Sequence, residues 1–443
     1  MNRLIYRCLR LLYITRRWLW TRFTPMGLGV LGCLVVTGLV GLGSTQSMCH
    51  MLFFFAAALL GLAAISNRAM VVRYKAMRTL PRFGTVGEPL YYEVQLQLLS
   101  SQAQRGAKLT ETIAEVFPSF QDFLNIRERC PADQKWIQAW RTYVSRQKWA
   151  IAPLIDLPPL SPETKTRTKG ELLPLRRGRL NLDGFDLVCV DPLGLIYTRH
   201  HYPFAQSVCI LPQRYRLPPL RLSNPKQRNR GNQCLVPSAG ESLEFRSLRD
   251  YRPGDPTQKI HWKSWAKVGR PIVKEQQEET GLRYGMVLDT FHSDRYSELF
   301  EVALAIAISF LTQDRPEESL LDVIFAAQET RCITVGQGLR HRAQILETLA
   351  TLTPNYEQNL ASLTPALQSQ LSTWNGCFCI FLDTDASRYA CLDLLIQQDV
   401  PTKAIFLCDG SRLATETDPY YRSPQCRTHY LSITQIQQEL LSI

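Results

Sequence analysis

The segment "RDYRPGDPTQKIHWKSWAKVGR", residues 249–270, gathers many residue types that can do chemistry. A histidine held by a carboxylate acts as a general base, so His261 with Asp255 or Glu275 is a candidate catalytic pair. No Ser or Cys nucleophile pattern and no metal-ligand spacing accompanies this pair to complete a mechanism. Catalysis is therefore one interpretation of the segment among several.

The same segment is rich in arginine and tryptophan, which favours three other interpretations. Trp and Arg stack on nucleic-acid bases, and they are also enriched at the centres of protein docking surfaces. In a purely structural interpretation, arginines pair with Asp250 and Asp255 while the tryptophans fill a domain junction. The residues assigned to a partner-binding surface are Arg249, Tyr251, Arg252, Pro253, Gly254, Asp255, His261, Trp262, Lys263 and Lys274.

A turn and a short helix must position these side chains. Pro253, Gly254 and Asp255 are turn residues. Asp255 also stands where a helix N-cap is expected, with a proline next to it and Gln258 three residues further on. The pattern predicts a helix over residues 256–268 that stops at Gly269.

The net charge of +12 does not indicate nucleic-acid binding, because it belongs to one end of the chain. Residues 1–87 hold 11 Lys and Arg residues and no acidic residue, whereas the rest holds 40 basic and 39 acidic residues. A nearly neutral remainder offers no broad positive field to a polyanion. We therefore expect no nucleic-acid partner.

Two uncharged apolar runs, residues 26–43 and 48–66, explain the basic end of the chain. Each is about long enough to cross the hydrocarbon core as a helix. Arginines and lysines flank the pair on both sides, which predicts that both flanks are cytoplasmic. A cleaved signal peptide is disfavoured for the first run, because the basic segment after the second run would then face outward.

We therefore expect a protein of the plasma membrane, with two helices in the lipid bilayer and both termini and the soluble domains in the cytoplasm. The irregular spacing of the 13 cysteines fits a reducing compartment. The first 25 residues are either a surface helix or a source of topogenic charge. Five regions follow from the pattern: a basic segment (1–25), a transmembrane hairpin (26–66), a β-sandwich-like region (67–215), a linker with the Arg/Trp-rich segment (216–280) and an α/β domain (281–443).

The two soluble regions differ in their periodicity. Short β-rich runs separated by Gly, Pro and Asp favour an all-β sandwich over residues 67–215. Residues 117–140 within it are ambiguous. From residue 281 onward, apolar strands alternate with helices, which predicts a mostly parallel sheet covered on both faces. Two of its strands end in acidic residues, one at Asp289 and the other at Asp383 and Asp385.

The residues of this pattern resemble the domain-of-unknown-function 58 family. The resemblance rests on "SLEFRSLRDYRPGDPTQKIHWKSWAKVGRPIVKEQQEE" (242–279) and on "LRRGRLNLDGFDLVCVDPLGLI" (175–196). The order of hairpin, β-region and α/β region also follows the family. The resemblance implies a membrane-anchored protein with a von Willebrand A-like α/β domain, associated with MoxR-type AAA+ ATPases.

The resemblance also implies a possible divalent-metal site, because von Willebrand A domains often carry Asp-x-Ser-x-Ser after the first strand. Here that position reads Asp289-Thr-Phe-His-Ser293, so Phe291 replaces one hydroxyl ligand. Asp383 or Asp385, after a later strand, is a candidate for a further oxygen. Mg²⁺ needs several well-placed oxygen ligands, which this degenerate pattern supplies poorly.

The function expected from these observations is that of a scaffold or adaptor. It would present the von Willebrand A-like domain and the Arg/Trp-rich surface to a partner such as a MoxR-type ATPase. The alternative is a metal-dependent hydrolase or a cell-envelope factor that uses Asp289 with Asp383, or Asp255 with His261. Whether the chain is an enzyme stays open, and the absence of a complete catalytic set favours the scaffold.

Overall fold

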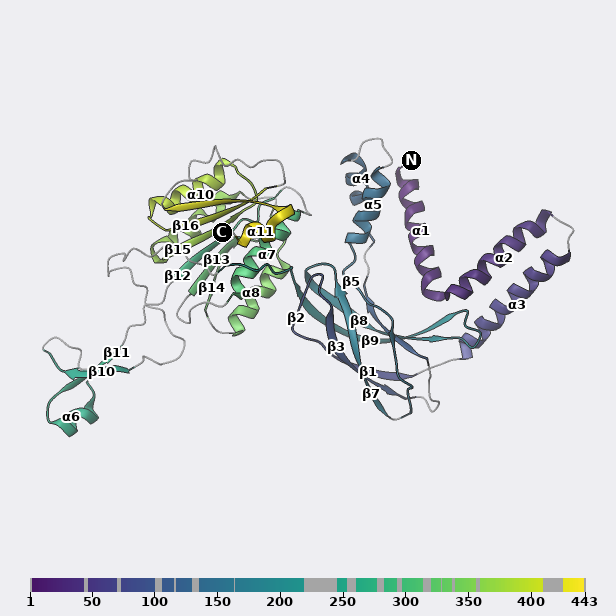
Figure 1. Ribbon diagram of the computed structural model, residues 1–443, viewed down its shortest axis with the longest axis horizontal. Helices are drawn as coiled ribbons and strands as arrows, with labels where there is room; N and C mark the ends of the chain where they lie inside the picture. The colour runs from purple at the N-terminus through teal and green to yellow at the C-terminus, as the bar shows by residue number, and fades with distance from the viewer. Residues whose placement is uncertain are drawn as a thin grey trace. The chain divides into compact units, whose positions relative to one another are not determined.

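The structure is a computed structural model, and Figure 1 shows its elements. Contacts divide the chain into two compact units, Met1–Gln213 and Arg214–Ile443. The described residues are 2–43, 47–69, 73–99, 106–114, 117–129, 135–162, 164–218, 245–252, 260–276, 283–292, 297–313, 320–327, 329–336, 339–355, 359–408 and 425–441.

The first unit begins with three helices. Helix α1 (Asn2–Arg22) is followed by α2 (Pro25–Gly43) and α3 (Ser47–Ala69), and α2 and α3 lie side by side (Figure 1). Within α3, Met48–Asn67 is long and apolar enough to cross a membrane, while the apolar stretch Pro25–Gly41 of α2 is shorter. The predicted pair of apolar helices is therefore confirmed. Its association with a membrane is indicated by length and composition, and its topology stays a prediction.

Two sheets form the rest of the first unit. Every second side chain of β3 is buried, as expected for a strand that has one face on a hydrophobic core. The side chains of both sheets meet in one hydrophobic core, as in Val94 and Leu96 of one sheet and Leu180 and Ile210 of the other. The first sheet has the order β1 (Tyr74–Thr79), β3 (Leu90–Leu98), β7 (Lys165–Pro174), β5 (Ala150–Ile151), and the second β2 (Phe83–Thr85), β9 (Tyr197–Leu211), β8 (Gly178–Val190), β4 (Lys108–Ile113), β6 (Ile155–Asp156).

The ambiguous stretch in this unit proves to be helical. Helices α4 (Phe120–Arg129) and α5 (Lys135–Arg146) lie between β4 and β5 in the chain. Ser119 and Asp122 form the N-terminal cap of α4, with the Ser119 hydroxyl 2.7 Å from the Asp122 carboxylate. The aromatic side chains of α4 and α5 pack on α1, which fixes that helix to the folded unit.

The second unit contains a six-stranded mixed sheet. Its order is β14-β13-β12-β15-β16-β17, and neighbouring strands are parallel except for the antiparallel pair of β13 and β14. The bounds are β12 (Arg283–Leu288), β13 (Leu320–Ala326), β14 (Thr330–Val335), β15 (Gly376–Phe381), β16 (Thr402–Cys408) and β17 (Cys426–Ser432). Every residue of β15 is buried, so both faces of the sheet are covered there. The predicted, mostly parallel α/β sheet is confirmed.

The helices of this unit are amphipathic or largely apolar. Helix α7 buries eleven of the twelve residues from Phe300 to Leu311. Ser297 caps its N-terminus by accepting a hydrogen bond from the Phe300 amide. The α-helices are α7 (Glu298–Thr312), α8 (Leu339–Thr351), α9 (Thr364–Gln370), α10 (Ala386–Gln397) and α11 (Ile436–Leu441), and short 3₁₀ helices cover Leu360–Leu363, Leu371–Thr373 and Ile433–Gln435.

A small hairpin completes the second unit. Strands β10 (Phe245–Asp250) and β11 (Ile272–Gln276) pair antiparallel, and the short helix α6 (Trp262–Val268) lies between them in the chain. We call these described parts, residues 245–252 and 260–276, the docking hairpin, after the docking interpretation of the sequence.

Candidate functional site

The docking hairpin brings together much of the Arg/Trp-rich segment. Arg249 pairs with Val273 across the two strands, and the Tyr251 amide donates to the Pro271 carbonyl at 2.9 Å. The ladder then continues where the His261 amide donates to the Ile272 carbonyl at 2.8 Å. The hydrogen bond between His261 and Ile272 closes the loop of residues 261–272, which contains α6.

The predicted helix of this segment is shorter than expected. Ile260 forms a β-bridge with Val273 and His261 is the N-cap, so the prediction that the helix already includes these residues is wrong. The His261 ring nitrogen Nδ1 lies 2.6 Å from the Ser264 hydroxyl. The predicted stop at Gly269 is confirmed, since it has φ 74° and caps the last turn. Pro253, Gly254 and Asp255 lie outside the described residues.

Helix α6 carries an aromatic pair, of which Trp262 is exposed and Trp265 half-buried. The rings of Trp262 and Trp265 stack with centroids 5.1 Å apart and planes at 18°, and Trp262 is 63% exposed. This indole does not fill a buried junction, as the structural interpretation assumed. Lys263 and Lys267 are exposed on the same helix, and Arg270 pairs with Asp250 at 3.1 Å. The structural interpretation expected the pairing of Asp250 with an arginine, and the docking interpretation expected exposed tryptophan. The stacking of the two rings was not predicted. Lys274 lies on β11.

A second candidate site lies at the carboxyl end of β12. Asp289 follows that strand and is completely buried. Its Oδ2 accepts hydrogen bonds from Nε of Arg388 at 2.8 Å and from the Leu382 amide at 3.0 Å, and its Oδ1 accepts from the Phe291 amide at 3.0 Å. Arg388 also donates to the Phe291 carbonyl and to Asp385. The carboxylate is thus satisfied by an internal cation and two backbone amides.

The electrostatics of this pair follow from its burial. Burial raises the pKa of the Asp289 carboxyl, and the adjacent Arg388 guanidinium opposes that rise. The two carboxylates raise the pKa of Arg388 in return, against the effect of its own burial. Asp385 has a lowered pKa because hydrogen bonds from Ser387 and Arg388 outweigh its partial burial. Arg388 was missed in the sequence, since it follows Asp289 by 99 residues and belongs to no motif.

The candidate metal ligands are not all gathered at this corner. Asp383 is exposed, and its carboxylate accepts from the Thr384 amide at 2.7 Å. Ser293 lies outside the described residues. In the described part of the chain, no group of three or more His, Cys, Asp or Glu side chains is arranged to hold a metal ion.

Asp289 lies at the point of the sheet where the chain order of the strands reverses. Strands β13 and β15 are both neighbours of β12, and the chain order of the sheet reverses between β12 and β15. In doubly wound sheets, ligands bind outside the carboxyl ends of the strands at such a switch point. Here the guanidinium of Arg388 reaches Asp289 and Asp385 at this position.

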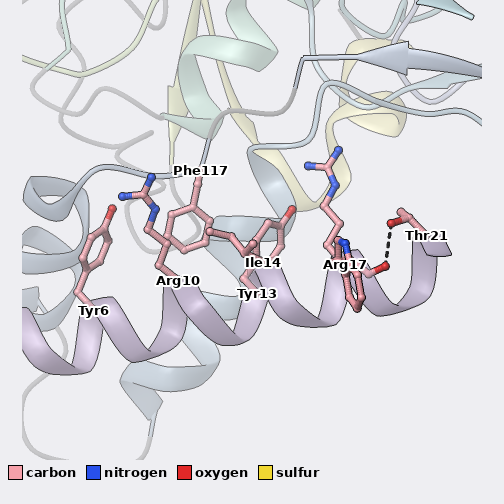
Figure 2. A pocket seen from close by; sticks show the side chains of 8 residues that line it. Tyr6, Arg10, Tyr13, Ile14, Arg17, Thr21 and Phe117 are labelled. Atoms are coloured by element: carbon pink, nitrogen blue, oxygen red, sulfur yellow. Dashed lines mark hydrogen bonds between the residues drawn. The ribbon is translucent and has the colours of Figure 1, made fainter. Parts of the chain in front are cut away.

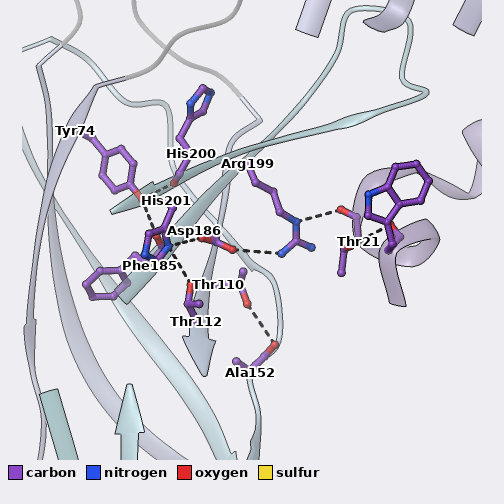
Figure 3. A network of polar contacts seen from close by, with 11 residues as sticks. Thr21, Tyr74, Thr110, Thr112, Ala152, Phe185, Asp186, Arg199, His200 and His201 are labelled. Atoms are coloured by element: carbon purple, nitrogen blue, oxygen red, sulfur yellow. Dashed lines mark hydrogen bonds and ion pairs between the residues drawn. The ribbon is translucent and has the colours of Figure 1, made fainter. Parts of the chain in front are cut away.

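A third polar cluster, in the first unit, resembles a catalytic triad in composition. Asp186 and Thr112 both approach Nδ1 of His201, at 2.9 and 3.4 Å (Figure 3). In a triad the acid and the nucleophile use opposite ring nitrogens, so this geometry does not support nucleophilic catalysis. Arg199 donates hydrogen bonds to the Asp186 carboxylate at 3.5 Å and to the Thr21 carbonyl at 3.1 Å. The cluster ties the end of α1 to β9.

The Asp-Pro-Leu-Gly-Leu element of the sequence makes a junction with α2. The buried Asp191 carboxylate accepts from the amides of Leu195 and Ile196, both at 2.6 Å. Thr24, the residue before α2, donates its hydroxyl to the Gly194 carbonyl at 2.6 Å and caps the helix by accepting from the Gly27 amide at 3.0 Å. This junction therefore fixes the first turn of α2 to the sheet.

A cavity of about 700 Å³ runs along α1. Figure 2 shows Tyr6, Arg10, Tyr13 and Arg17 pointing from α1 to the side on which Phe117 lies. The hydroxyl of Tyr6 donates to the Pro118 carbonyl at 2.8 Å. Ile14, Trp18 and Thr21 complete the lining. The basic helix is therefore more than a source of topogenic charge, because one of its faces forms part of a cavity.

Comparisons with known proteins find one matching family model. Residues 247–379 match the family model described as "Protein of unknown function DUF58". No curated protein matches the chain. The match begins in β10 and ends in β15, so it includes Asp289 and the docking hairpin except for residues 245–246, while Arg388 lies beyond it.

The solved structures with some similarity carry no argument about the fold. A beta-glucosidase from Listeria innocua is 9% identical with a TM-score of 0.15, and the alignment covers 31% of this chain and 16% of that one. A cohesin module of a family 33 glycoside hydrolase from Clostridium perfringens is also 9% identical with a TM-score of 0.15, covering 32% of this chain and 100% of the module. The family resemblance expected from the sequence is confirmed by the family model, which residues 247–379 match: "Protein of unknown function DUF58".

Proposed function

We propose that this chain is a membrane-associated scaffold whose docking hairpin binds a protein partner on the cytoplasmic side of the cell membrane. The observation that carries the proposal is the exposed stack of Trp262 and Trp265. An indole that is 63% exposed offers a large, rigid apolar surface that a partner can bury at little entropic cost. A stacked pair is also more rigid than a single exposed ring.

The chemistry of the hairpin defines the partner. Lys263 and Lys267 are exposed on the same helix as the indoles, so the matching surface carries acidic residues around an apolar pocket. Such complementary charges speed association and fix the orientation of the two proteins. The resemblance to the DUF58 family suggests a MoxR-type AAA+ ATPase as this partner.

The anchor in this proposal is the pair of α2 and α3. Met48–Asn67 has the length and hydropathy of a membrane span, and basic residues flank the pair on both sides. The positive-inside rule then orients both flanks to the cytoplasm. The soluble parts of the chain follow the second flank and would face the same compartment.

The mixed sheet would serve as the platform of the scaffold, and we assign it a von Willebrand A-like fold. Its order, with one antiparallel edge strand, β14, beside five parallel strands, supports this assignment. The Asp289–Arg388 pair at the switch point favours a binding or structural role over metal-assisted hydrolysis, since the carboxylate oxygens already accept three hydrogen bonds.

A direct binding measurement tests the proposal. The purified chain in mild detergent is immobilised, and a purified MoxR-type ATPase from the same organism is added with a non-hydrolysable ATP analogue. We expect Trp262→Ala to weaken binding by roughly tenfold or more, as for an aromatic hot spot. Lys263→Glu with Lys267→Glu should mainly slow association.

Val268→Ala is the matched control, because this residue is 50% exposed at the other end of the same helix. It should bind within about twofold of the native chain, as expected for a residue outside the hot spot. Equal binding by the native chain and Trp262→Ala would show that the hairpin is not the docking surface. Absence of binding by the native chain would exclude this class of ATPase as the partner.

A further inference from the structure

Helix α1 carries an ordered stripe of arginine and tyrosine. Arg3, Tyr6, Arg10, Tyr13 and Arg17 follow one another at intervals of three and four residues, so they lie on one face of the helix. The stripe faces the folded unit, where Arg3 lies over the Phe120 ring at 5.8 Å. A helix that supplied only topogenic charge would have no need of this alternation.

The cavity beside this stripe has the chemistry of an anion site. Its described lining includes the guanidinium groups of Arg10 and Arg17 and the phenols of Tyr6 and Tyr13. Guanidinium groups bind phosphate oxygens through paired hydrogen bonds. Phe117 lies beside Arg10 and Tyr13 and adds an apolar surface to the lining.

The position of the cavity points to a ligand in the membrane. Thr21 lies at one end of the cavity, only four residues before Pro25, where the apolar helix α2 begins. Trp18 is 53% exposed at that end, and tryptophans gather where a membrane meets water. The Arg199 bond to the Thr21 carbonyl holds this end of α1 in place.

We propose that the α1 cavity binds the headgroup of an anionic phospholipid in the leaflet that α2 enters. Arg10 and Arg17 bind the phosphate, and Ile14 with Trp18 contacts the apolar part of the lipid next to it. The inference rests on the proposed membrane anchoring. It adds a specific lipid ligand to that anchoring and does not involve the docking hairpin.

The test is native mass spectrometry of the purified full chain in detergent, titrated with phosphatidylglycerol and, separately, with phosphatidylcholine. We expect phosphatidylglycerol to bind preferentially to the native chain. Arg10→Gln with Arg17→Gln should weaken that binding by about 30-fold, the effect of two basic residues at an anionic surface. The native chain and the double variant should bind phosphatidylcholine equally.

Arg7→Gln with Arg16→Gln is the matched control, because both residues are exposed on α1 and neither lines the cavity. If the two double variants weaken binding equally, the helix acts through its net charge and the specific site does not exist. If inorganic phosphate displaces the lipid from the native chain at equal concentration, the ligand is a soluble phosphate and the lipid assignment is wrong.

A separate experiment distinguishes failure of the site from failure of the anchor. The native chain is floated with vesicles of pure phosphatidylcholine, to which the α1 cavity contributes no charge-dependent binding. Flotation with equal lipid binding by both double variants would overturn the site and leave the anchor intact. Failure to float would overturn the anchor, and with it the lipid site.

Discussion

At the residue scale, three of the buried carboxylates are each matched by an arginine from a distant part of the chain. Asp289 pairs with Arg388 at 2.8 Å and Asp322 with Arg283 at 2.6 Å. Glu111 meets Arg78, which also lies over the Phe185 ring at 4.9 Å. Such pairs add little net stability when intact, yet they are costly to break, because the remaining charge is left buried.

The Asp289–Arg388 pair gives the first prediction. Arg388→Met should lower the free energy of unfolding by about 3–5 kcal/mol, since Asp289 loses its cation. Burial already raises the pKa of Asp289, and the variant raises it further. A carboxyl with a raised pKa in the folded state stabilises at low pH and loses that contribution as the pH rises, so the variant should regain stability on acidification.

The measurement is denaturant unfolding of the detergent-solubilised chain, with the double variant Asp289→Asn, Arg388→Met as the control. The double variant should be more stable than Arg388→Met alone, because it removes the buried charge and its Asn oxygen can still accept one of the two amide hydrogen bonds. A single Arg388→Met variant as stable as the native chain would contradict the assigned pair.

Glu111 gives a second prediction at this scale. Burial raises its pKa from 4.5 to about 7, although Arg78 lowers it. Between these values the folded chain holds a proton that the unfolded chain has released. The free energy of unfolding should therefore fall as the pH rises through this window, by at most about 1.4 kcal/mol per pH unit.

The apparent melting temperature at about pH 5 and about pH 8 measures this effect, in the range where the Glu111 carboxyl titrates. Glu111→Gln should reduce the difference between the two melting temperatures. Glu93→Gln is the control, because Glu93 is exposed on β3 in the same unit and should leave the dependence unchanged. A native slope that survives in Glu111→Gln belongs to another group.

At the element scale, the junction between α2 and the Asp191 turn depends on a close backbone approach. A Cβ at Gly27 would lie 2.0 Å from the Leu195 carbonyl oxygen, whereas a Cβ at Gly29 would meet nothing within 4 Å. Leu195 and Ile196 are buried there with Ala63 of α3. Only a glycine at position 27 allows α2 to start against this turn.

The third prediction compares these two glycines. Gly27→Ala should force α2 away from the turn and expose the junction to protease, while Gly29→Ala should leave it protected. The readout is limited trypsin digestion of the detergent-solubilised chain, with cleavage after Arg22 measured by mass spectrometry. Equal protection of both variants would show that α2 does not dock on the turn. Accelerated cleavage in both would point to a general loosening of the helix.

Elements with a strong local pattern could be predicted from the sequence, and those defined by distant partners could not. The apolar helix pair, the strands and the stop of α6 at Gly269 each have a local signal. The start of α6 was misplaced because a β-bridge of Ile260 with Val273 competes with helix formation. Arg388 and the α1 cavity were not predicted, because each is formed by contacts between residues about a hundred positions apart in the chain.

At the scale of the whole molecule, the charge distribution and the helix pair imply one orientation in the membrane. The basic residues of the first 87 positions flank the apolar helices on both sides, so the turn between α2 and α3 should face outward and everything else inward. Native thiols can report this arrangement, because exposed Cys8 and Cys332 lie on α1 and β14 while half-buried Cys49 lies near the start of α3.

The fourth prediction is that a membrane-impermeant maleimide labels Cys49 in intact spheroplasts and labels Cys8 and Cys332 only in inverted vesicles. Partial burial and the nearby Asp322 raise the pKa of the Cys332 thiol, so the reaction needs mildly alkaline buffer to provide thiolate. Labelled peptides are quantified by mass spectrometry, with detergent-lysed membranes showing the full reactivity of each thiol. Labelling of Cys332 in intact spheroplasts would place the second unit outside the cell, where a cytoplasmic ATPase has no access to the docking hairpin. Labelling of Cys8 on both sides of the membrane would instead indicate that the helix pair inserts in two orientations.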